Sequence, residues 1–569
     1  MEKRVFLAIF LCFVVLVIYQ AYFVPPPPPR RPPETPAPQV VAPDVDQTTR
    51  PADPAVAPTE AAPPSARPLV ADAAVRDIVV ETDLVRAVFT SAGGTLKSWK
   101  LKNYLDAGGQ PVELVPSFPN AIRPFTMATT DAALSVTLRN ALFQPSADQL
   151  ALGAAPGTLT FLYRDESGLN ARKTFHFQPE QKFYIVNVSA DLDVNGVAQP
   201  VTLDWGPAIR LGYGLESEVG PRAIFYRDDA AERLTADAMN PPPRVEGELR
   251  FAGVDDHYFL SAVLPGTQRL AVVYQPHTDT VQVAGEAQPR AFISYRVSTP
   301  GAAALTYFMG PKDFDVLRAV DPPLVFAIDF GIFRWLVVPL LQALKWIHGY
   351  LGNYGWSIIV LTVLINLAIF PLRHRSMVSM RKMQALQPEM KALQERYAKY
   401  KITDPERQKM NQEMMALYKQ RGVNPASGCV PMLLTFPILF AFYAMLSAAI
   451  ELRGAPFFGW IRDLSAADPY YIWPVLMGGT MFWQQKITPT TVDPTQARIF
   501  MMMPIVFTFM FLWFPSGLVI YWLASNLMAI GQQYVTNRII GPPPAPPKAV
   551  TPAGPPAKRG RKGADAGKP

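Results

Sequence analysis

The chain has 569 residues, of which 49% are hydrophobic, and a formal net charge of +7. This length predicts several domains rather than one core, and the only two cysteines, Cys12 and Cys429, argue against a disulfide framework or a cysteine-based metal site. Residues 373–424 hold 12 Lys or Arg against 5 Asp or Glu, and the tail after residue 540 is also basic. Beside apolar segments, such stretches indicate the cytoplasmic side of a membrane before they indicate nucleic acid, and no DNA partner is expected.

Residues 1–24 predict a signal-anchor transmembrane helix. Lys3 and Arg4 precede an apolar run that is long enough for one crossing, so the N-terminus should lie inside. Ala21-Tyr22-Phe23 is not a cleavage site of the small-x-small type. Residues 25–73 then form a proline-rich periplasmic linker, which we expect to be an extended, solvated spacer.

Residues 74–325 predict a periplasmic all-β supersandwich domain. Short runs rich in β-branched and aromatic residues occur at 77–82, 84–90, 158–163 and 183–188, with turn signals at Gly93-Gly94 and Gly108-Gly109. Many short strands at such spacing are typical of a large sandwich. Its position after a helix whose N-terminus lies inside places it outside the cytoplasm.

The remaining chain predicts a polytopic α-helical membrane protein with six transmembrane helices, counting the anchor. Residues 330–350 suit an amphipathic helix in the interface, interrupted at Pro339. Transmembrane helix 2 is expected at 356–372, and helices 3 to 6 within 430–531 at about 430–450, 471–483, 499–514 and 518–531.

A basic cytoplasmic coiled-coil hairpin is expected over residues 373–424, and a basic proline-rich cytoplasmic tail over 541–569. Apolar residues repeat every three or four positions from Met380 to Tyr400, and Asp404-Pro405-Glu406 is a helix start signal for the returning arm. With the N- and C-termini cytoplasmic, every strongly basic segment lies inside.

No motif for catalysis is found. The sequence lacks a phosphate loop, a zinc motif, a nucleophile elbow and a dinucleotide fingerprint. Asp255-Asp256-His257 is the one cluster of titratable residues, and we interpret it as a surface turn of the sandwich. We therefore expect no enzyme, no nucleotide hydrolysis, no cofactor and no metal.

Polar residues inside the apolar stretches predict a substrate groove. Thr362, Asn366 and Arg373 share one side of helix 2, and polar groups within a span either face a wet interior or bond to neighbouring helices. Similar residues on later spans favour the groove, which we expect to be formed by Thr362, Asn366, Arg373, Thr435, Tyr521 and Ser525. Arg373 should lie about 10 Å nearer the cytoplasm than Asn366, at 1.5 Å per residue.

Two further features fit such a groove. The stretches 471–483 and 518–531 are shorter than a bilayer crossing requires, which favours a locally thinned membrane. Of 20 methionines, 16 lie between Met377 and Met528. Flexible thioethers suit surfaces that accept many apolar partners, although they also fill cores between helices.

Several stretches resemble the YidC branch of the YidC/Oxa/Alb family of membrane protein insertases, in the form found in bacteria with two membranes. The resemblance in architecture covers essentially the whole chain and is strongest from Trp346 onward. It is carried by residues 353–357, 379–388, 414–419, 423–425, 464–471, 487–491 and 514–518.

The resemblance implies an inner-membrane insertase with a five-helix core and a hydrophilic groove open to the cytoplasm and to lipid. It also implies that nascent membrane proteins enter alone or with the Sec translocon, and that the hairpin and tail help to receive ribosomes. On the hairpin, Arg381, Lys382, Lys391 and Arg396 are the expected recruitment residues. The family usually carries a groove arginine at the position of Asn366, so Arg373, His374 or Arg375 is expected to supply the charge.

Two other functions remain open from the residues alone. Polar groups within spans also line the paths of transporters and channels, but the long basic hairpin and the short spans argue against that interpretation. The second is a membrane-anchored periplasmic protein that binds or modifies sugars.

Overall fold

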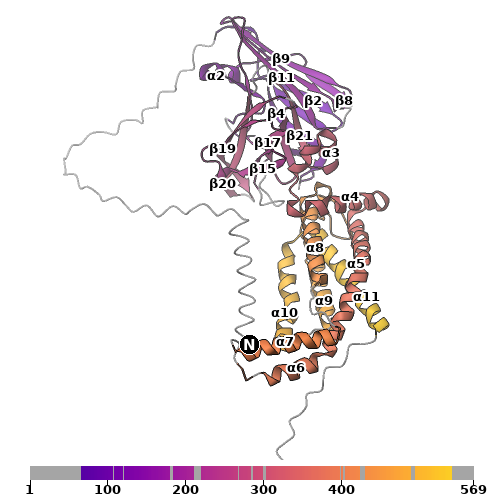
Figure 1. The fold of residues 1–569 in the computed structure, drawn as a ribbon. Helices are drawn as coiled ribbons and strands as arrows, with labels where there is room; N and C mark the ends of the chain where they lie inside the picture. The colour runs from indigo at the N-terminus through magenta and orange to yellow at the C-terminus, as the bar shows by residue number, and fades with distance from the viewer. Residues whose placement is uncertain are drawn as a thin grey trace, which may run out of the picture. The chain divides into compact units, whose positions relative to one another are not determined.

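The computed structural model describes residues 66–106, 108–118, 121–179, 183–210, 220–266, 268–283, 286–298, 303–397, 399–400, 404–422, 430–488 and 494–540 (Figure 1). The described chain forms two compact units. The first contains the chain up to residue 342 together with 441–466, and the second contains 343–440 and the chain from 467 onward. The expected anchor at 1–24, most of the linker and the tail at 541–569 lie outside the described residues.

The first unit is built mainly of β-strands, which confirms the predicted β-rich domain. Its largest sheet has the order β1 (Pro68–Val70), β9 (Gly157–Asp165), β10 (Leu169–Phe177), β11 (Ile185–Val194), β21 (Ala303–Pro311), β18 (Phe259–Leu264), β17 (Phe251–Asp255), β14 (Arg222–Arg227) and β15 (Ala230–Thr235), with β12 (Val197–Ala198) beside β11 and β7 (Gln144–Pro145) beside β9.

Two five-stranded sheets complete the described strands. One has the order β16 (Arg244–Gly247), β19 (Leu270–Val283), β20 (Glu286–Ser298), β13 (Thr202–Trp205) and β6 (Thr126–Ala128). The other has the order β5 (Pro111–Glu113), β4 (Thr95–Leu105), β3 (Val85–Thr90), β2 (Asp77–Thr82) and β8 (Gln149–Gly153). Only β2 and β8 pair in parallel among these strands.

Two short helices interrupt the predicted strand pattern of this domain. Helix α2 (Ala132–Asn140) begins after Asp131, and helix α3 (Phe314–Val320) begins after Asp313. In each case the aspartate carboxylate accepts hydrogen bonds from two backbone N–H groups of the first turn, which otherwise have no partner in the helix.

Alternation along the strands builds the core, and it also buries one lysine. On β10 every second side chain is buried, and Lys173 lies in that inward row with Phe175. Its ammonium group donates to the backbone oxygens of Gly93 and Phe125 and lies 5.2 Å from the centre of the Phe143 ring. Because the charged form loses water there, burial lowers the pKa of Lys173 to about 7.

The predicted Gly93-Gly94 turn provides one of these oxygens. Both glycines have positive φ, 66° and 54°, a conformation that L-residues with side chains rarely adopt. A Cβ on Gly94 would lie 3.1 Å from the Cβ of Phe161 and 3.3 Å from the Cε of Lys173. The turn therefore needs glycine both for its backbone and for its close approach to the core.

The expected surface turn at Asp255-Asp256-His257 was wrong, because both carboxylates are buried among cations. Asp255 is fully buried and pairs with Lys312 at 3.0 Å and with Arg222 at 3.2 Å. Asp256 accepts from the backbone N–H groups of the next turn and pairs with Arg210 at 3.3 Å. Charges this deeply buried persist only when they are paired.

His257 connects this cluster to residues 441–466 of the same unit. Its Nε2–H donates to the backbone oxygen of Ser447 over 2.6 Å, and burial lowers the pKa of His257, which favours the neutral ring. The guanidinium of Arg453 lies 5.8 Å from the ring centres of both Tyr258 and Phe259. These contacts attach the segment after residue 440 to the β-domain.

The helical part of the chain has eight described α-helices of the following bounds. They are α4 (Arg334–Leu351), α5 (Tyr354–Ala385), α6 (Gln387–Arg396), α7 (Pro405–Gln420), α8 (Val430–Ala448), α9 (Ile472–Ile487), α10 (Pro494–Met510) and α11 (Ser516–Ile540). Among the described residues, α5 alone is both long and apolar enough to cross a membrane by length and composition. Phe436–Ala448 and Met501–Trp513 are shorter apolar helical segments.

The helix bounds confirm some predictions and correct others. Helix α7 begins at Pro405 with Asp404 as its N-cap, as predicted. Pro339 lies within α4 and does not end it. Helix α5 continues through the expected boundary at residue 373 to Ala385, so the predicted span and the start of the predicted hairpin belong to one helix. The apolar stretch 518–531 is part of α11, a helix of 25 residues, which is long enough for a crossing. Of these two helices, only α9, with 16 residues, is shorter than the crossing length, as predicted for 471–483.

The buried ion pair in the β-domain gives a first prediction. Lys312→Met should lower the free energy of unfolding by about 3–5 kcal/mol, because it leaves Asp255 with a buried and incompletely paired charge. Replacing both partners, Lys312→Met with Asp255→Leu, should cost less than the sum of the single changes. The measurement is chemical denaturation of the full-length protein in detergent. The control is Arg250→Met, which breaks an exposed pair with Asp321 and should change stability by less than about 1 kcal/mol.

Lys173 gives a second prediction, which concerns pH. Between the folded pKa of about 7 and the unfolded value of 10.5, the unfolded chain binds a proton that the folded chain does not. Stability therefore rises with pH across this window. Lys173→Met removes this contribution, so its melting temperature relative to the unmodified protein should be highest below pH 7 and fall as the pH approaches 10. An equal difference at pH 6, 8 and 9.5 would contradict the assignment.

Candidate functional site

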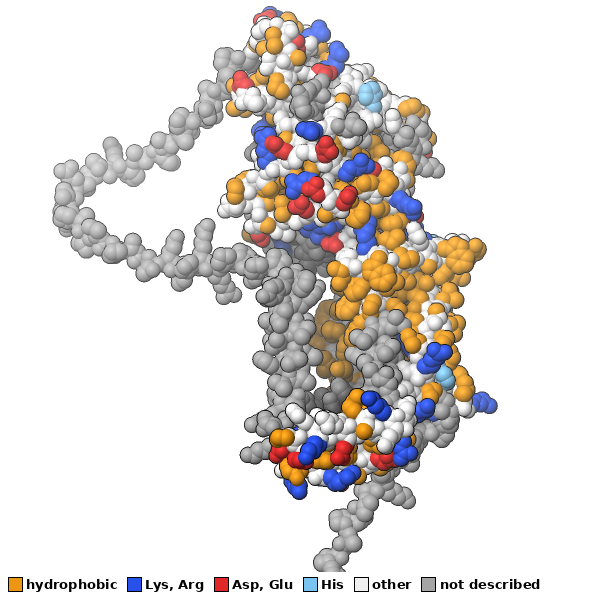
Figure 2. Space-filling view, in the orientation of Figure 1, with side chains coloured by type: hydrophobic (Ala, Val, Ile, Leu, Met, Phe, Trp, Pro, Cys, Tyr) orange, Lys and Arg blue, Asp and Glu red, His pale blue; other side chains and the backbone are white. Residues whose placement is uncertain are grey.

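The second unit buries several polar side chains among its helices and exposes many large apolar ones, which is unusual for a water-soluble protein. Thr362 and Asn366 of α5 and Asn526, Gln533 and Thr536 of α11 are all buried. Large apolar side chains of the same helices, of α10 and of the short helical turn after it are exposed, among them Leu364, Leu367, Ile505, Val506, Phe509, Trp513 and Leu527. Figure 2 shows hydrophobic side chains covering much of the visible surface of the helices. Such a surface fits lipid, which solvates apolar groups and cannot satisfy polar ones.

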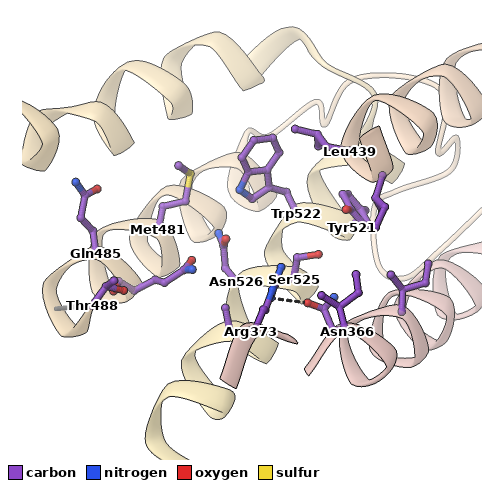
Figure 3. Close-up of a pocket in the computed structure, with 15 residues that line it drawn as sticks. Asn366, Arg373, Leu439, Met481, Gln485, Thr488, Tyr521, Trp522, Ser525 and Asn526 are labelled. Carbon is purple, nitrogen blue, oxygen red and sulfur yellow. Dashed lines mark hydrogen bonds between the residues drawn. The ribbon is translucent and has the colours of Figure 1, made fainter. Parts of the chain in front are cut away.

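A cavity of about 440 Å³ opens among four of these helices (Figure 3). Its walls come from α5, α8, α9 and α11. The lining residues are Ile365, Asn366, Ile369, Arg373, Ile438, Leu439, Met481, Gln484, Gln485, Thr488, Tyr521, Trp522, Ser525, Asn526 and Ala529. The cavity thus combines amide, hydroxyl and guanidinium groups with aliphatic and aromatic ones.

Arg373 and Asn366 are in direct contact in this cavity. The Nη1 of Arg373 donates to Oδ1 of Asn366 over 2.9 Å, as Figure 3 shows with a dashed line. Side chains on a helix tilt toward its N-terminus, so the guanidinium reaches back along α5 from a Cα that is seven residues later. The guanidinium of Arg373 therefore reaches the side chain of Asn366, although the Cα of Arg373 lies about 10 Å further along the helix, at 1.5 Å per residue.

Gln532 of α11 completes this polar group. Its Nε2 donates to the backbone oxygen of Asn366 over 3.0 Å, and its Oε1 lies 3.4 Å from Nη1 of Arg373. Asn366 in turn donates through Nδ2 to the backbone oxygen of Thr362 over 2.8 Å. The chain of contacts runs from one turn of α5 to the next and across to α11.

The other predicted groove residues have separate positions. Tyr521 and Ser525 line the cavity with Asn366 and Arg373. Thr362 is buried but does not line it, and its hydroxyl donates to the backbone oxygen of Ile358 in its own helix. The side chain of Thr435 lies outside the described residues. Four of the six predicted residues are thus brought together.

Several cavity or network residues were missed from the sequence. Three of them, Gln484, Gln485 and Thr488, follow residue 483, where the predicted transmembrane stretch ends, so they were not considered as groove residues. Gln532 is seven residues after Ser525, a spacing that returns to the same face of a helix. That spacing was the available signal for Gln532.

A second line of polar contacts joins α5 and α11 beyond the cavity. His374 Nδ1 lies 3.4 Å from the hydroxyl of Thr536, and Arg381 donates to Oδ1 of Asn537. Arg381 is accordingly buried, in contrast to Lys382, Lys391 and Arg396, which are exposed. Of the four residues predicted for recruitment, Arg381 instead takes part in the packing of two helices.

Helices α6 and α7 pack against each other as two arms. The hydroxyl of Tyr397 donates to Glu413 over 2.9 Å, and Arg421 pairs with Glu389 at 2.6 Å. The hydroxyl of Tyr418 lies 3.5 Å from the sulfur of Met390. These contacts hold the two arms together along their length.

Comparisons with known proteins identify the family of this chain. A family model described as 60Kd inner membrane protein matches residues 346–542, and a model described as YidC periplasmic domain matches residues 77–343. The membrane protein insertase YidC of Syntrophus aciditrophicus is 38% identical over 560 residues, which cover 95% of this chain and 100% of that protein. The YidC insertase of Geotalea daltonii is 36% identical, with 95% of this chain and 99% of that protein covered.

The chain belongs to the YidC family.

A solved structure of an active YidC insertase, with its first transmembrane domain resolved, covers 83% of this chain and 95% of that chain, with 18% identity and a TM-score of 0.34. The family models describe an inner membrane protein and a periplasmic domain, which implies an inner-membrane location. Residues 77–343, nearly all of them in the β-rich first unit, match the YidC periplasmic domain, and the residues that line the cavity lie within the part matched by the inner membrane protein model. The two relatives given above are named as membrane protein insertases, and not as transporters or as proteins that modify sugars.

Proposed function

We propose that this chain is a membrane protein insertase that passes short polar segments of nascent membrane proteins through the cavity around Asn366 and Arg373. One observation supports this most directly. A cavity with amide, hydroxyl and guanidinium groups lies within a set of helices whose outer surface is apolar. Such a site offers hydrogen bonds to a polar segment at a depth where lipid offers none.

The proposed mechanism uses partitioning as its driving force. The polar flank of a substrate exchanges water for Asn366, Arg373, Tyr521 and Ser525, while its apolar segment slides along the exposed apolar faces of α8 and α11. Release into lipid is then favourable by about 0.8 kcal/mol for each buried CH₂ group. The membrane potential adds about 2.3 kcal/mol per charge for each 100 mV when an acidic flank moves outward. No nucleotide is needed in this scheme.

The membrane topology is part of this proposal. Six spans, with the anchor at 1–24 first, place both termini and the α6–α7 hairpin in the cytoplasm and the β-domain in the periplasm. Helix α4 then lies in the outer interface, where its exposed Trp335, Trp346 and Tyr350 suit the headgroup region. Helix α9 has 16 residues, or about 24 Å at 1.5 Å per residue, against a hydrocarbon core of about 30 Å. A short helix favours local thinning, which shortens the crossing.

The proposed partners are nascent membrane proteins, the Sec translocon, the ribosome and lipid. On the hairpin we assign ribosome recruitment to Lys382, Lys391 and Arg396, and we leave Arg381 out because it is buried against α11. The β-domain is proposed to act as a spacer or docking module, since its buried charges are paired with one another.

Insertion assays test the proposed function. Vesicles that contain the full-length protein should insert a single-span substrate without added nucleotide, and empty vesicles should not. Arg373→Ala should lower insertion of a substrate with an acidic tail by roughly tenfold, the loss expected for one hydrogen bond to a charged group, and should affect a neutral-tailed substrate less. The matched control is Arg375→Ala, since Arg375 is exposed on the same helix. If Arg373→Ala inserts both substrates normally, its role as the groove charge is wrong.

Charge removal on the hairpin tests recruitment. Changing Lys382, Lys391 and Arg396 together to Gln should weaken co-sedimentation of the full-length protein with ribosomes, and raising the salt concentration should remove the difference because exposed charges are screened. The control removes three exposed arginines of the β-domain, Arg139, Arg164 and Arg172, in the same way. Equal weakening in both triple variants would show that only net charge matters and would exclude the hairpin as the binding surface.

A further inference from the structure

The cavity contains an arginine whose position is set by two neutral amides. Arg373 has two oxygen contacts within the described part of the chain, Oδ1 of Asn366 at 2.9 Å and Oε1 of Gln532 at 3.4 Å. Both involve the same nitrogen, Nη1. No Asp or Glu of the described residues pairs with Arg373.

The orientation of each amide follows from the groups around it. A backbone carbonyl only accepts hydrogen bonds and a guanidinium only donates them. Gln532 contacts the carbonyl of Asn366, so its Nε2 must point there and its Oε1 must face the guanidinium. Asn366 contacts the carbonyl of Thr362 through Nδ2, so its Oδ1 must face the guanidinium as well. Backbone carbonyls of α5 thus orient both oxygens toward one nitrogen.

This arrangement leaves the charge of Arg373 available. The amides are neutral and do not cancel the positive charge. Because Nη1 is held by Asn366 and Gln532, the Nε and Nη2 donors have no partner among the described residues. These two donors form the edge of a guanidinium that binds a carboxylate in bidentate fashion.

We infer that Gln532 is a positioning residue that holds the Arg373 guanidinium inside the cavity and so makes the site selective for acidic segments of the substrate. This inference rests on the proposed insertase function. A lysine or arginine near the end of a membrane span turns its charged end toward water unless something holds it. Gln532 supplies that restraint from α11, and its 7% exposure shows that it is itself fixed in the helix packing.

Two substitutions of Gln532 test separately whether its contact holds Arg373 and whether the charge of Arg373 matters. Gln532→Leu removes the acceptor for Arg373 and the donor to the backbone oxygen of Asn366, so Arg373 keeps only its contact with Oδ1 of Asn366 and is held less firmly in the cavity. Gln532→Glu keeps the length of the side chain but places a carboxylate beside the guanidinium, which cancels its charge. Both should impair acidic substrates, and the glutamate should impair them more.

The matched control is Gln533→Leu. Gln533 is the adjacent residue on α11, is also buried, and donates to Asn537 over 3.0 Å without contacting Arg373. It has the same side chain and a similar degree of burial. A loss caused only by weaker helix packing should therefore appear equally in this variant.

The experiment compares two versions of one single-span substrate, with two Asp or two Asn in a short translocated tail, inserted into vesicles by the full-length protein. The ratio of acidic to neutral insertion is the readout. Gln532→Leu should lower this ratio, and Gln532→Glu should lower it further, by roughly tenfold, as expected for the loss of one charged hydrogen bond. Gln533→Leu should leave it unchanged.

The outcomes distinguish the inference from the function on which it rests. If the unmodified protein inserts neither substrate, the proposed function fails. If the unmodified protein inserts both substrates and the Gln532 variants leave the ratio of acidic to neutral insertion unchanged, the inference is overturned. An equal loss of both substrates would then show that Gln532 has only a structural role. A ratio that falls in Gln533→Leu as much as in Gln532→Glu also overturns the inference.

Discussion

Hydrocarbon provides no hydrogen-bond partners, and this constraint determines the arrangement of the helical unit. Every polar side chain within a span has to be satisfied by protein or by water held inside the protein. The unit meets this requirement by turning Asn366, Asn526, Gln532 and Thr536 inward and by leaving aliphatic and aromatic residues on the outside. Where several polar groups face one another, the space between them becomes a cavity that has polar side chains among its apolar ones. The cavity is therefore a consequence of how these helices pack.

The same constraint explains why amides take such a large part in the site. An Asn or Gln side chain can bond a backbone carbonyl with one end and offer an oxygen with the other, so it connects helices without introducing charge. Asn366 and Gln532 both do so at Arg373. An acidic residue in either place would form a buried ion pair, which stabilises the helices at the cost of the free charge. The neutral amides keep the cation and hold it in place.

Sequence reasoning was most successful where pattern and local signals agree. The strand runs at 77–82 and 158–163 appear as β2 and β9, and Asp404 caps α7 as expected. It failed at Asp255, because two adjacent acidic residues read as surface while their partner Lys312 is 57 residues away. The cavity was found in part, since the spacing on α5 is visible in one helix. Gln484 and Gln532 were missed because their contribution depends on which helices are neighbours.

The cavity contains a guanidinium although the arginine expected at residue 366 is absent. The resemblance predicted an arginine at this position, and the guanidinium found beside Asn366 belongs to Arg373, two turns further along α5. A long side chain that tilts toward the helix N-terminus makes this substitution possible. The exchange has a physical consequence. Arg373 contacts both Asn366 of its own helix and Gln532 of α11, so separation of α5 from α11 would remove one of its two contacts together with one wall of the cavity.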